Sequence, residues 1–229
     1  MRNARSLLAI DATTSLCSVA WTDGTRTVER VEDAGQRHSE LVLAMVGAVL
    51  GEAGVPLSAV DEFAFGAGPG SFTGLRIACG VVQGLAFAAN RPVRPVSSLL
   101  ALAEATGTDA VLTAIDARMN EVYWAAYRRA GPDAPWRAVH APDVSSADRV
   151  TVPEGLGWTA AGDAFVVHPA LAARMTPAIT IDGRARITAA TIARLAWRGE
   201  APTVDAADAM PEYVRDKVAL TTAERAAVA

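Results

Sequence analysis

The chain has 229 residues, enough for one large domain or for two smaller ones, each with a hydrophobic core of its own. Apolar residues make up 51% of it and charged residues 20%, which excludes the polar, highly charged composition of disordered chains. The net charge of -4 excludes a broad basic surface for nucleic acid, because such a surface needs clustered lysine and arginine.

The first hundred residues predict an N-terminal lobe that alternates strands and helices. Turn residues separate the short apolar runs at the start, and serines stand before the helical runs as caps. The second helix ends at Asn90, because Pro92 disfavours helical backbone before it. The predicted elements are, in chain order, two or three strands over 6–33, a helix over 39–53, a strand over 60–68, a helix over 72–90, and a third helix that begins at Ser97 or Ser98. The lobe spans residues 1–100, and the prolines after Asn90 mark its seam with the next lobe.

A second lobe is predicted over residues 101–219. It opens, like the first, with a strand, an acidic turn and another strand, and Asp116 recurs where the first lobe has Asp11. This repetition indicates an internal duplication. The remaining predictions are loops around one short strand over 131–153, small strands with a helix near 169–175 over 155–182, and an amphipathic helix over 188–199 that packs back on the N-terminal lobe. We expect the tail, residues 220–229, to be disordered.

The cysteines and the apolar runs indicate the compartment. The two cysteines, Cys17 and Cys79, lie far apart in sequence among apolar residues, which is typical of buried thiols in a reducing compartment. The start of the chain imitates a signal peptide, but Asp11 interrupts its apolar run after a few positions. No uninterrupted apolar stretch reaches the roughly 18 residues that span a bilayer. The sequence therefore predicts a cytoplasmic protein without membrane contact.

The turn after the first strand carries Asp11, Thr13 and Thr14. A carboxylate in such a turn can hold a hydrated magnesium ion, and the hydroxyls can reach phosphate oxygens. The same residue types are also those that a tight turn prefers. Together with Asp116 of the second lobe they form a candidate vestigial nucleotide site, and the alternative is an ordinary turn.

Four glycines, Gly66, Gly68, Gly70 and Gly74, lead into the second helix. A serine occupies the position where G-x-G-x-x-G needs its third glycine, and no Gly-Lys-Ser/Thr ending completes a Walker loop. What remains is a glycine turn before a helix N-terminus, which either binds an anion through free amides or aims the helix. We favour the second interpretation, a helix hinge.

The two long helices, 39–53 and 72–90, carry apolar residues on every face. A surface helix of a small lobe normally has a polar side. Either both helices are buried in one core, or one face packs on the sheet of the lobe and the other on a partner. Gly80 and Gly84, one turn apart, leave a shallow groove in which another helix can approach closely.

The histidines give no support to metal chemistry. His38, His140 and His168 are isolated in the sequence, and no H-E-x-x-H is present. A zinc hydrolase site therefore lacks its ligands. No G-x-S-x-G surrounds a serine nucleophile either, so no set of peptidase residues can be assembled.

Taken together, the motifs resemble those of a known family. The segments that carry the resemblance are, in order, LLAIDATTSLCSVA, QRHSELVLAMV, GAGPGSFTGLRIACGVVQGLA, PVSSLLALA, DARMNEVYWAAY and PEYVRDKVA. They resemble the TsaB family, bacterial proteins required for threonylcarbamoyl modification of adenosine in transfer RNA. The match runs from about residue 7 to 219, and GPGSFTGLR is its most specific part. The resemblance implies an α/β fold of two lobes of the actin and sugar kinase type, also called ribonuclease H-like, each a mixed sheet with flanking helices.

The resemblance also implies a function without catalysis. Members of this family pair with TsaD, the subunit that binds metal and nucleotide and transfers the threonylcarbamoyl group, and the ATPase TsaE joins them. The pairing surface is built from the helices that correspond to 39–53 and 72–90. The interface residues expected on them are Leu43, Val46, Leu50, Leu75, Cys79, Val82 and Phe87. Transfer RNA is contacted only through the complex, and ATP and metal are expected on the partner subunits.

Two interpretations stay open from the sequence. The first is a non-catalytic subunit that pairs with TsaD, and that forms a homodimer through the same helices when TsaD is absent. The second is an autonomous enzyme, a phosphotransfer ATPase that uses Asp11, Thr13, Thr14 and Asp116 around magnesium, or a peptidase. The second lobe has Gly162 without the consecutive glycines that ATP-binding relatives use, which weakens the ATPase interpretation.

Overall fold

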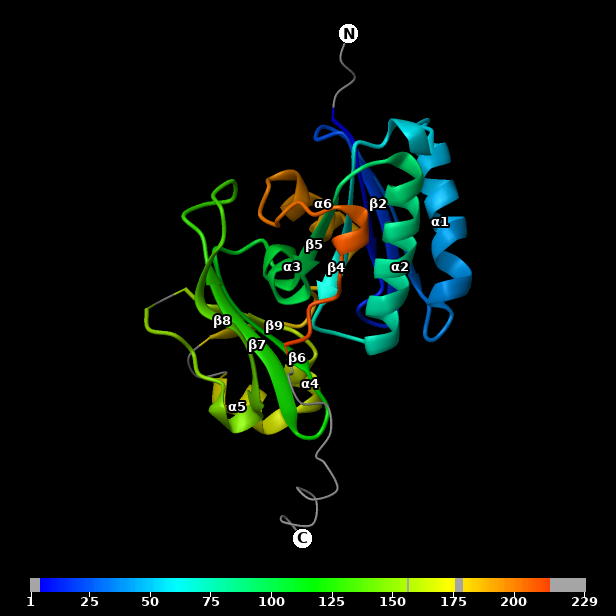
Figure 1. Ribbon diagram of the computed structural model, residues 1–229. Coiled ribbons are helices and arrows are strands. Elements are labelled where there is room, and N and C mark those ends of the chain that lie inside the picture. The colour runs from blue at the N-terminus through cyan, green and yellow to red at the C-terminus, as the bar shows by residue number, and fades with distance from the viewer. Residues whose placement is uncertain (1–4, 156, 176–178, 215–229) are drawn as a thin grey trace.

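The computed structural model describes residues 5–155, 157–175 and 179–214. It has two lobes, each built on a five-stranded mixed sheet with flanking helices (Figure 1). The predicted two-lobed α/β architecture is therefore confirmed. The tail that was expected to be disordered, residues 220–229, lies outside the described residues.

The first sheet has the strand order β3-β2-β1-β4-β5. Its central strand β1 pairs antiparallel with β2 and parallel with β4, and Leu8 is aligned with Trp21 on one side and Phe63 on the other. The elements of this lobe are β1 (Leu7–Asp11), β2 (Leu16–Thr22), β3 (Thr27–Asp33), α1 (His38–Ala53), a short 3-10 helix (Leu57–Ala59), β4 (Glu62–Gly68), α2 (Phe72–Ala89) and β5 (Val93–Ser97). Both long helices match their predicted ranges to within one residue.

The second sheet repeats this topology. Its order is β10-β9-β6-β7-β8, which is the first order read from the other end. Here β6 pairs antiparallel with β7 and parallel with β9, so β6 occupies the place of β1. The elements are α3 (Ser98–Ala105), β6 (Ala110–Asp116), β7 (Glu121–Arg128), β8 (Arg137–Ser146), β9 (Thr159–Ala161), α4 (Ala164–Val167), α5 (Pro169–Met175), β10 (Thr180–Asp182) and α6 (Ala189–Trp197). Asp11 and Asp116 end equivalent strands, so the topology repeats as an internal duplication predicts.

One prediction in this lobe is wrong. The stretch 131–153 was expected to consist of loops around one short strand, but β8 runs for ten residues within it. This strand lies at the edge of the sheet and has no fully buried side chain, so its sequence lacks the apolar alternation of a core strand. Its Pro142 is compatible with such an edge position.

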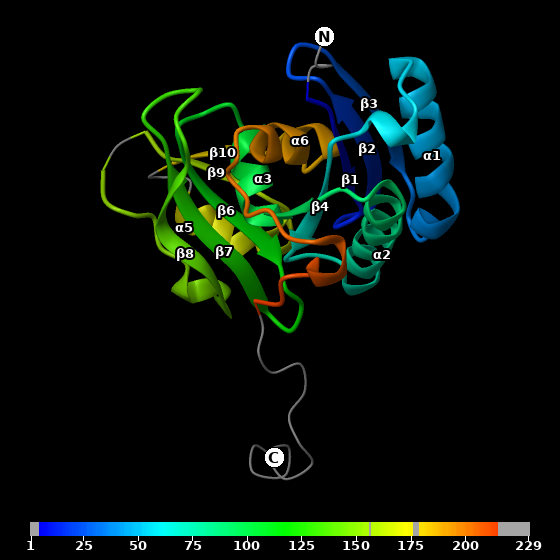
Figure 2. The same cartoon turned by 45° about the horizontal axis from the view of Figure 1, so that its top comes forward.

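The elements form stacked layers (Figure 2). Helices α1 and α2 cover one face of the first sheet, and α6 and α3 lie against its other face, between the two sheets. Helices α4 and α5 pack on the far side of the second sheet, around Leu112 and Trp158. Side chains of the N-terminal lobe cap α6, since the amide of Ala189 donates to Ser18 Oγ at 2.8 Å and that of Ala190 to Glu29 Oε1 at 2.7 Å. The last helix thus packs on the first sheet.

The segment after α6 returns to the N-terminal lobe. Val204 bridges to Val93 at the edge of the first sheet. Further on, the carbonyl of Ala209 accepts hydrogen bonds from Cys79 Sγ at 3.3 Å and from Gln83 Nε2 at 2.9 Å. This segment, orange to red in Figures 1 and 2, therefore lies beside α2.

Candidate functional site

The glycine loop before α2 is packed against the turn that follows β1. A Cβ at Gly66 would collide with the carboxylate of Asp11, and one at Gly74 would collide with the carbonyl oxygen of Ala12. A Cβ at Gly70 would lie 2.6 Å from the Thr13 carbonyl oxygen. The glycines are therefore needed because two backbone segments approach closely.

The amides at this helix start are already hydrogen-bonded within the chain. The amide of Ser71 donates to the Thr13 carbonyl at 2.8 Å, and that of Gly74 donates to Ser71 Oγ at 3.3 Å. In a phosphate-binding loop these amides point at the ligand. Here the turn Asp11–Thr13 occupies the corresponding space. The geometry supports a packing role for the glycines, including Gly68, whose added Cβ would lie 2.7 Å from the Glu212 carbonyl oxygen.

Asp11 is fully buried below this loop. Its Oδ1 accepts a hydrogen bond from Thr13 Oγ1 at 2.9 Å. Burial raises the pKa of the Asp11 carboxyl to about 7, although the Thr13 hydrogen bonds oppose the shift. The hydroxyl of Thr14 accepts from the Leu16 amide at 3.1 Å. The side chains proposed for magnesium and phosphate are thus engaged inside the lobe.

Asp116 lies at the equivalent position of the second lobe with partners of its own. Its Oδ1 is 3.1 Å from His168 Nε2, and its amide donates to Asp163 Oδ1 at 2.9 Å. Burial, with a contribution from the neighbouring Asp116 charge, raises the pKa of Asp163. Among the described residues no hydrogen bond or ion pair joins Asp116 to Asp11, Thr13 or Thr14. Over the same residues, no three His, Cys, Asp or Glu side chains are placed to hold a metal ion.

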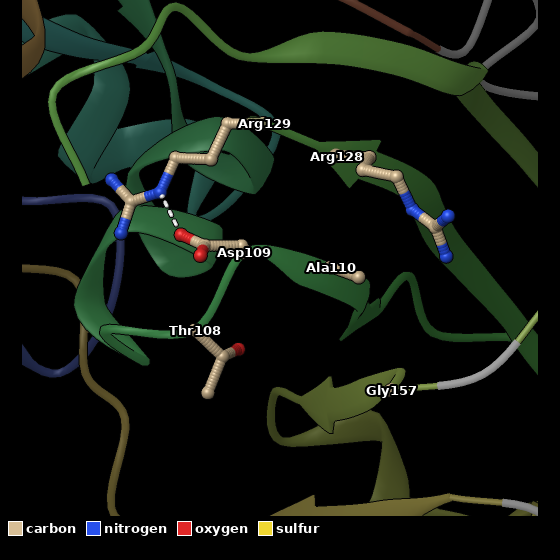
Figure 3. A pocket seen from close by; sticks show the side chains of 6 residues that line it. All are labelled: Thr108, Asp109, Ala110, Arg128, Arg129 and Gly157. Carbon is tan, nitrogen blue, oxygen red and sulfur yellow. Dashed lines mark hydrogen bonds and ion pairs between the residues drawn. The ribbon is translucent and has the colours of Figure 1, made fainter. Parts of the chain in front are cut away.

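A hollow of about 500 Å³ lies on the second lobe (Figure 3). Its charged side chains already have partners within the chain. Arg129 turns toward Asp109, with Nε 2.7 Å from Oδ1, and Arg128 extends away from both toward the ring of Trp158. Arg129 also donates to Glu104 at 3.1 Å. These contacts support a structural role for Arg128 and Arg129 in the second lobe.

The two cysteines are buried and unpaired with each other, as predicted. Burial raises the pKa of Cys17 to about 11, and the nearby Asp11 and Glu32 charges add to the shift. Such a thiol is protonated at neutral pH and is a poor nucleophile.

The seven interface residues expected on α1 and α2 divide into two groups. Leu43 and Phe87 are 58% and 80% exposed. The other five lie in the hydrophobic core or at its edge and hold the helices on the first sheet: Val46, Leu50, Leu75, Cys79 and Val82. These five expose at most 8% of their surface, so in this conformation Leu43 and Phe87 are the expected interface residues that remain open to a partner. Val46, Leu50, Cys79 and Val82 belong to the core between these helices and the sheet, and Leu75 lies beside Gly68 at the end of β4.

The outward surface of these helices carries many small and apolar residues beside the exposed Glu40, Glu52 and Arg76. We define the α1–α2 outer face by its exposed members, Leu43, Ala44, Gly47, Ala48 and Gly51 on α1, and Gly80, Gly84, Phe87 and Ala88 on α2. An added Cβ at any of its four glycines meets nothing within 4 Å. Since glycine in a helix interior costs about 1 kcal/mol relative to alanine, these glycines weaken the isolated lobe without any packing benefit.

Part of this surface was visible in the sequence. The pair Gly80 and Gly84 was identified as a groove, but the matching pair Gly47 and Gly51 on α1 was missed. The signal was the same spacing of four residues, which places both glycines of a pair on one side of a helix.

Helix α2 is also the single helix in the described part of the chain that is long and apolar enough to cross a membrane. This rests on its 18 residues and mean hydropathy of 1.4, that is, on length and composition only. The structure gives another reason for its composition: Ala78, Val82 and Ala86 are buried on the inner side of the helix, while Gly80 and Gly84 face outward.

Comparisons with known proteins agree with this architecture. A family model described as TsaD, tRNA N6-adenosine threonylcarbamoyltransferase, matches residues 31–156. The tRNA threonylcarbamoyladenosine biosynthesis protein TsaB of Escherichia coli (strain K12) is 37% identical over 226 residues, which cover 93% of this chain and 96% of the relative. The protein of that name from Haemophilus influenzae is 38% identical over 173 residues, covering 68% of this chain and 73% of its own.

Solved structures give the same result. YeaZ from Pseudomonas aeruginosa superposes with a TM-score of 0.80 at 41% identity, covering 91% of this chain and 99% of that one. A second structure from that organism, described as an uncharacterized protein with similarity to peptidase YeaZ, has a TM-score of 0.82 at 41% identity and covers 92% and 100%. Sequence similarity over nearly the whole length thus accompanies the shared two-lobed actin-like fold, and this chain belongs to the TsaB family.

Proposed function

We propose that this chain serves tRNA threonylcarbamoyladenosine biosynthesis as a non-catalytic subunit that pairs with TsaD through the α1–α2 outer face. The relatives named above carry this pathway in their names, and a TsaD family model matches more than half of the chain. The threonylcarbamoyl group is transferred by the partner, to the adenosine next to the anticodon of tRNAs that read ANN codons.

The observation that carries the proposal is the set of exposed glycines on the two helices. Gly47, Gly80 and Gly84 lie inside helices, and no atom of the described residues fills the space beside them. Small residues at such spacing let the backbone of another helix approach closely. Exposed Leu43 and Phe87 supply large apolar side chains near them, as expected of an interface.

The absence of catalysis is part of the proposal. Asp11, Thr13 and Asp116 are engaged in hydrogen bonds within their own lobes, which supports a structural role for them. We therefore assign ATP and metal to the partner subunits, with TsaE joining the pair. The net charge of -4 favours transfer RNA contact through the complex rather than through this chain.

Light scattering after size-exclusion chromatography tests the pairing. The chain is run alone and with TsaD of its own organism, and Ala48→Glu is compared with the control Ala173→Glu on the exposed side of α5. We expect a one-to-one complex that Ala48→Glu abolishes and Ala173→Glu retains, because an unpaired charge buried in an interface is strongly unfavourable. A complex that survives Ala48→Glu would contradict the proposed surface.

The same experiment addresses self-association. We expect the chain alone to form a homodimer through the α1–α2 outer face, since its apolar surface is otherwise exposed to water. A monomer at high concentration would contradict this part of the proposal and leave the pairing with TsaD untouched.

A further inference from the structure

An arginine and two aromatic rings form an exposed cluster at the start of α2. Phe72 and Arg76 come from the first turns of the helix, and Tyr213 comes from the segment that returns after α6. Phe72 is 54% and Tyr213 46% exposed, although both are large aromatic side chains. The three residues meet on one surface although Arg76 and Tyr213 are 137 residues apart in sequence.

The cluster fixes the guanidinium group of Arg76. Its Cζ lies 3.9 Å from the centroid of the Phe72 ring, and its Nε donates to Tyr213 Oη at 3.3 Å. The two rings lie 6.1 Å apart, centroid to centroid, at an angle of 39°. Stacking and the Nε hydrogen bond restrict a side chain that is otherwise flexible.

The charge of Arg76 has no carboxylate partner within 5–155, 157–175 and 179–214. Its Nε donates to the phenol oxygen of Tyr213, whereas Arg129 and Arg198 both form ion pairs with Glu104. Glu212 stands beside Tyr213 in sequence, but burial raises the pKa of its carboxyl, the opposite of what an ion pair with Arg76 would do. The Nη groups of Arg76 are the donors that bind a carboxylate in a bidentate manner.

The cluster continues the α1–α2 outer face. Phe72, Arg76, Gly80 and Gly84 follow one another at intervals of four, and all four are exposed. They therefore lie along one side of α2. A partner helix that packs over the glycines would reach Arg76 at the N-terminal end of α2.

The chemistry of the surroundings favours a protein partner over nucleic acid. Binding to a nucleic acid backbone is favoured by several basic residues together, whereas this chain is acidic overall and the neighbouring side chains are aromatic and apolar. Arginine and tyrosine are the residue types that carry most of the binding energy in protein interfaces.

We infer that Arg76, held by Phe72 and Tyr213, is a specificity determinant of the pairing surface that binds a carboxylate group of the partner protein. This inference rests on the proposed function. It adds a charge requirement to a surface that is otherwise small and apolar, and so distinguishes a partner with an acidic residue at that point from a second copy of this chain.

Affinity measurements form the first test. The dissociation constant for TsaD is measured by calorimetry at low and high salt for the natural chain, Arg76→Gln and Tyr213→Phe, with Arg137→Gln on β8 as the control. We expect at least a tenfold weaker complex and a smaller salt dependence for Arg76→Gln, a smaller loss for Tyr213→Phe, and no change for the control. Thermal melting of each variant shows that the fold is retained.

The second test uses the scarcity of lysine in the chain. Lys217 is the one lysine of the sequence. A double variant that combines Lys217→Arg with Arg76→Lys therefore carries its only side-chain amine at position 76. A carbodiimide then joins this amine to any carboxylate in contact with it, and mass spectrometry maps the product. We expect a cross-link to an Asp, Glu or terminal carboxylate of TsaD, and none from Arg137→Lys in the same background.

The outcomes separate this inference from the proposed function. If Ala48→Glu abolishes the complex but Arg76→Gln binds within twofold of the natural chain, the carboxylate contact is overturned and the pairing stands. An intrachain cross-link to Glu212 alone also overturns it. If Arg76→Gln lowers binding to transfer RNA and leaves the affinity for TsaD unchanged, the cluster is a nucleic acid contact. If the natural chain does not bind TsaD, both proposals fail.

Discussion

Gly66 lies so close to Asp11 that a side chain at position 66 would occupy the space of the Asp11 carboxylate. This contact joins β4 to the end of β1. The glycine-rich segment is thus a packed junction between two turns and does not have the open form of a phosphate-binding loop.

Replacement of Gly74 by alanine should destabilise the fold. An added Cβ collides with the carbonyl oxygen of Ala12, which is backbone and cannot rotate away. We expect the free energy of unfolding to fall by about 1–3 kcal/mol, measured by urea denaturation. Gly183→Ala, where a Cβ meets nothing within 4 Å, is the control. Equal stability of the Gly74→Ala variant and the natural chain would contradict the packed junction.

The glycines of the α1–α2 outer face should respond in the opposite way. Gly80→Ala and Gly84→Ala meet open space, so each should stabilise the isolated chain by about 0.5–1 kcal/mol through helix propensity. Each should nevertheless weaken the complex with TsaD, because the methyl group blocks the close approach of a helix. Thermal melting of the free chain and calorimetry of the complex measure the two effects. A stabilised variant with unchanged affinity would count against close helix packing at these glycines.

Asp11→Asn should change how stability depends on pH. The Asp11 pKa is about 7 in the folded protein and 3.8 in the unfolded chain, so between these values the folded state holds more protons. The contribution of Asp11 to the free energy of unfolding therefore decreases as the pH rises from about 4 to about 7, by about 4 kcal/mol. Asparagine keeps an oxygen for Thr13 and has no charge to bury.

Urea denaturation at several pH values measures this difference. We expect Asp11→Asn to be more stable than the natural chain at pH 8 and similar at pH 4. Asp133→Asn, on an exposed loop, controls for the loss of one negative charge. If the free energy of unfolding changes equally between pH 4 and pH 7 in the natural chain and in Asp11→Asn, the effect of burying the Asp11 charge is refuted.

Glu104→Gln should be strongly destabilising. The Glu104 carboxylate is buried and accepts hydrogen bonds from Arg129, Arg198 and Trp136. Burial raises its pKa, but the Arg198 and Trp136 hydrogen bonds and the arginine charges outweigh burial and hold the pKa below its usual 4.5. Removal of the charge takes one of two carboxylates from the buried Arg129, which keeps only the half-exposed Asp109, and we expect this to cost about 3 kcal/mol.

The exposed ion pair of Arg30 and Glu52 serves as the comparison for the buried Glu104 network. Glu52→Gln removes the partner of Arg30 at a surface where both side chains are about half exposed, so the loss should stay below about 1 kcal/mol. Because the pKa of Glu104 is lowered, its contribution is present at neutral pH and is lost as the pH falls below about 4.5. Comparable losses for the two variants at pH 7 would contradict the buried network.

Much of the fold could be predicted from the sequence because its signals are local. Helix α2 begins after a serine cap and ends at Asn90 in the left-handed conformation before a proline, and these residues act within their own turns. The repetition of Asp11 as Asp116 indicated the duplicated topology that the two sheets show. The length of the edge strand β8 was underestimated, because an exposed strand lacks the alternation on which the prediction depends.

The sequence by itself determined that α1 and α2 exist, that both are apolar all round, and that a Walker loop and a histidine pair are missing. Only the tertiary structure decided which side of each helix faces the sheet, so that Val82 is buried while Gly84, two residues later, is exposed. It also showed that Asp11 and Thr13 fill the glycine loop, and that Tyr213 reaches Arg76. The physical reason is that these contacts join residues distant in sequence. A helix without a polar stripe carries no local mark of its buried face, and that face is set only when the sheet and the returning segment pack against it.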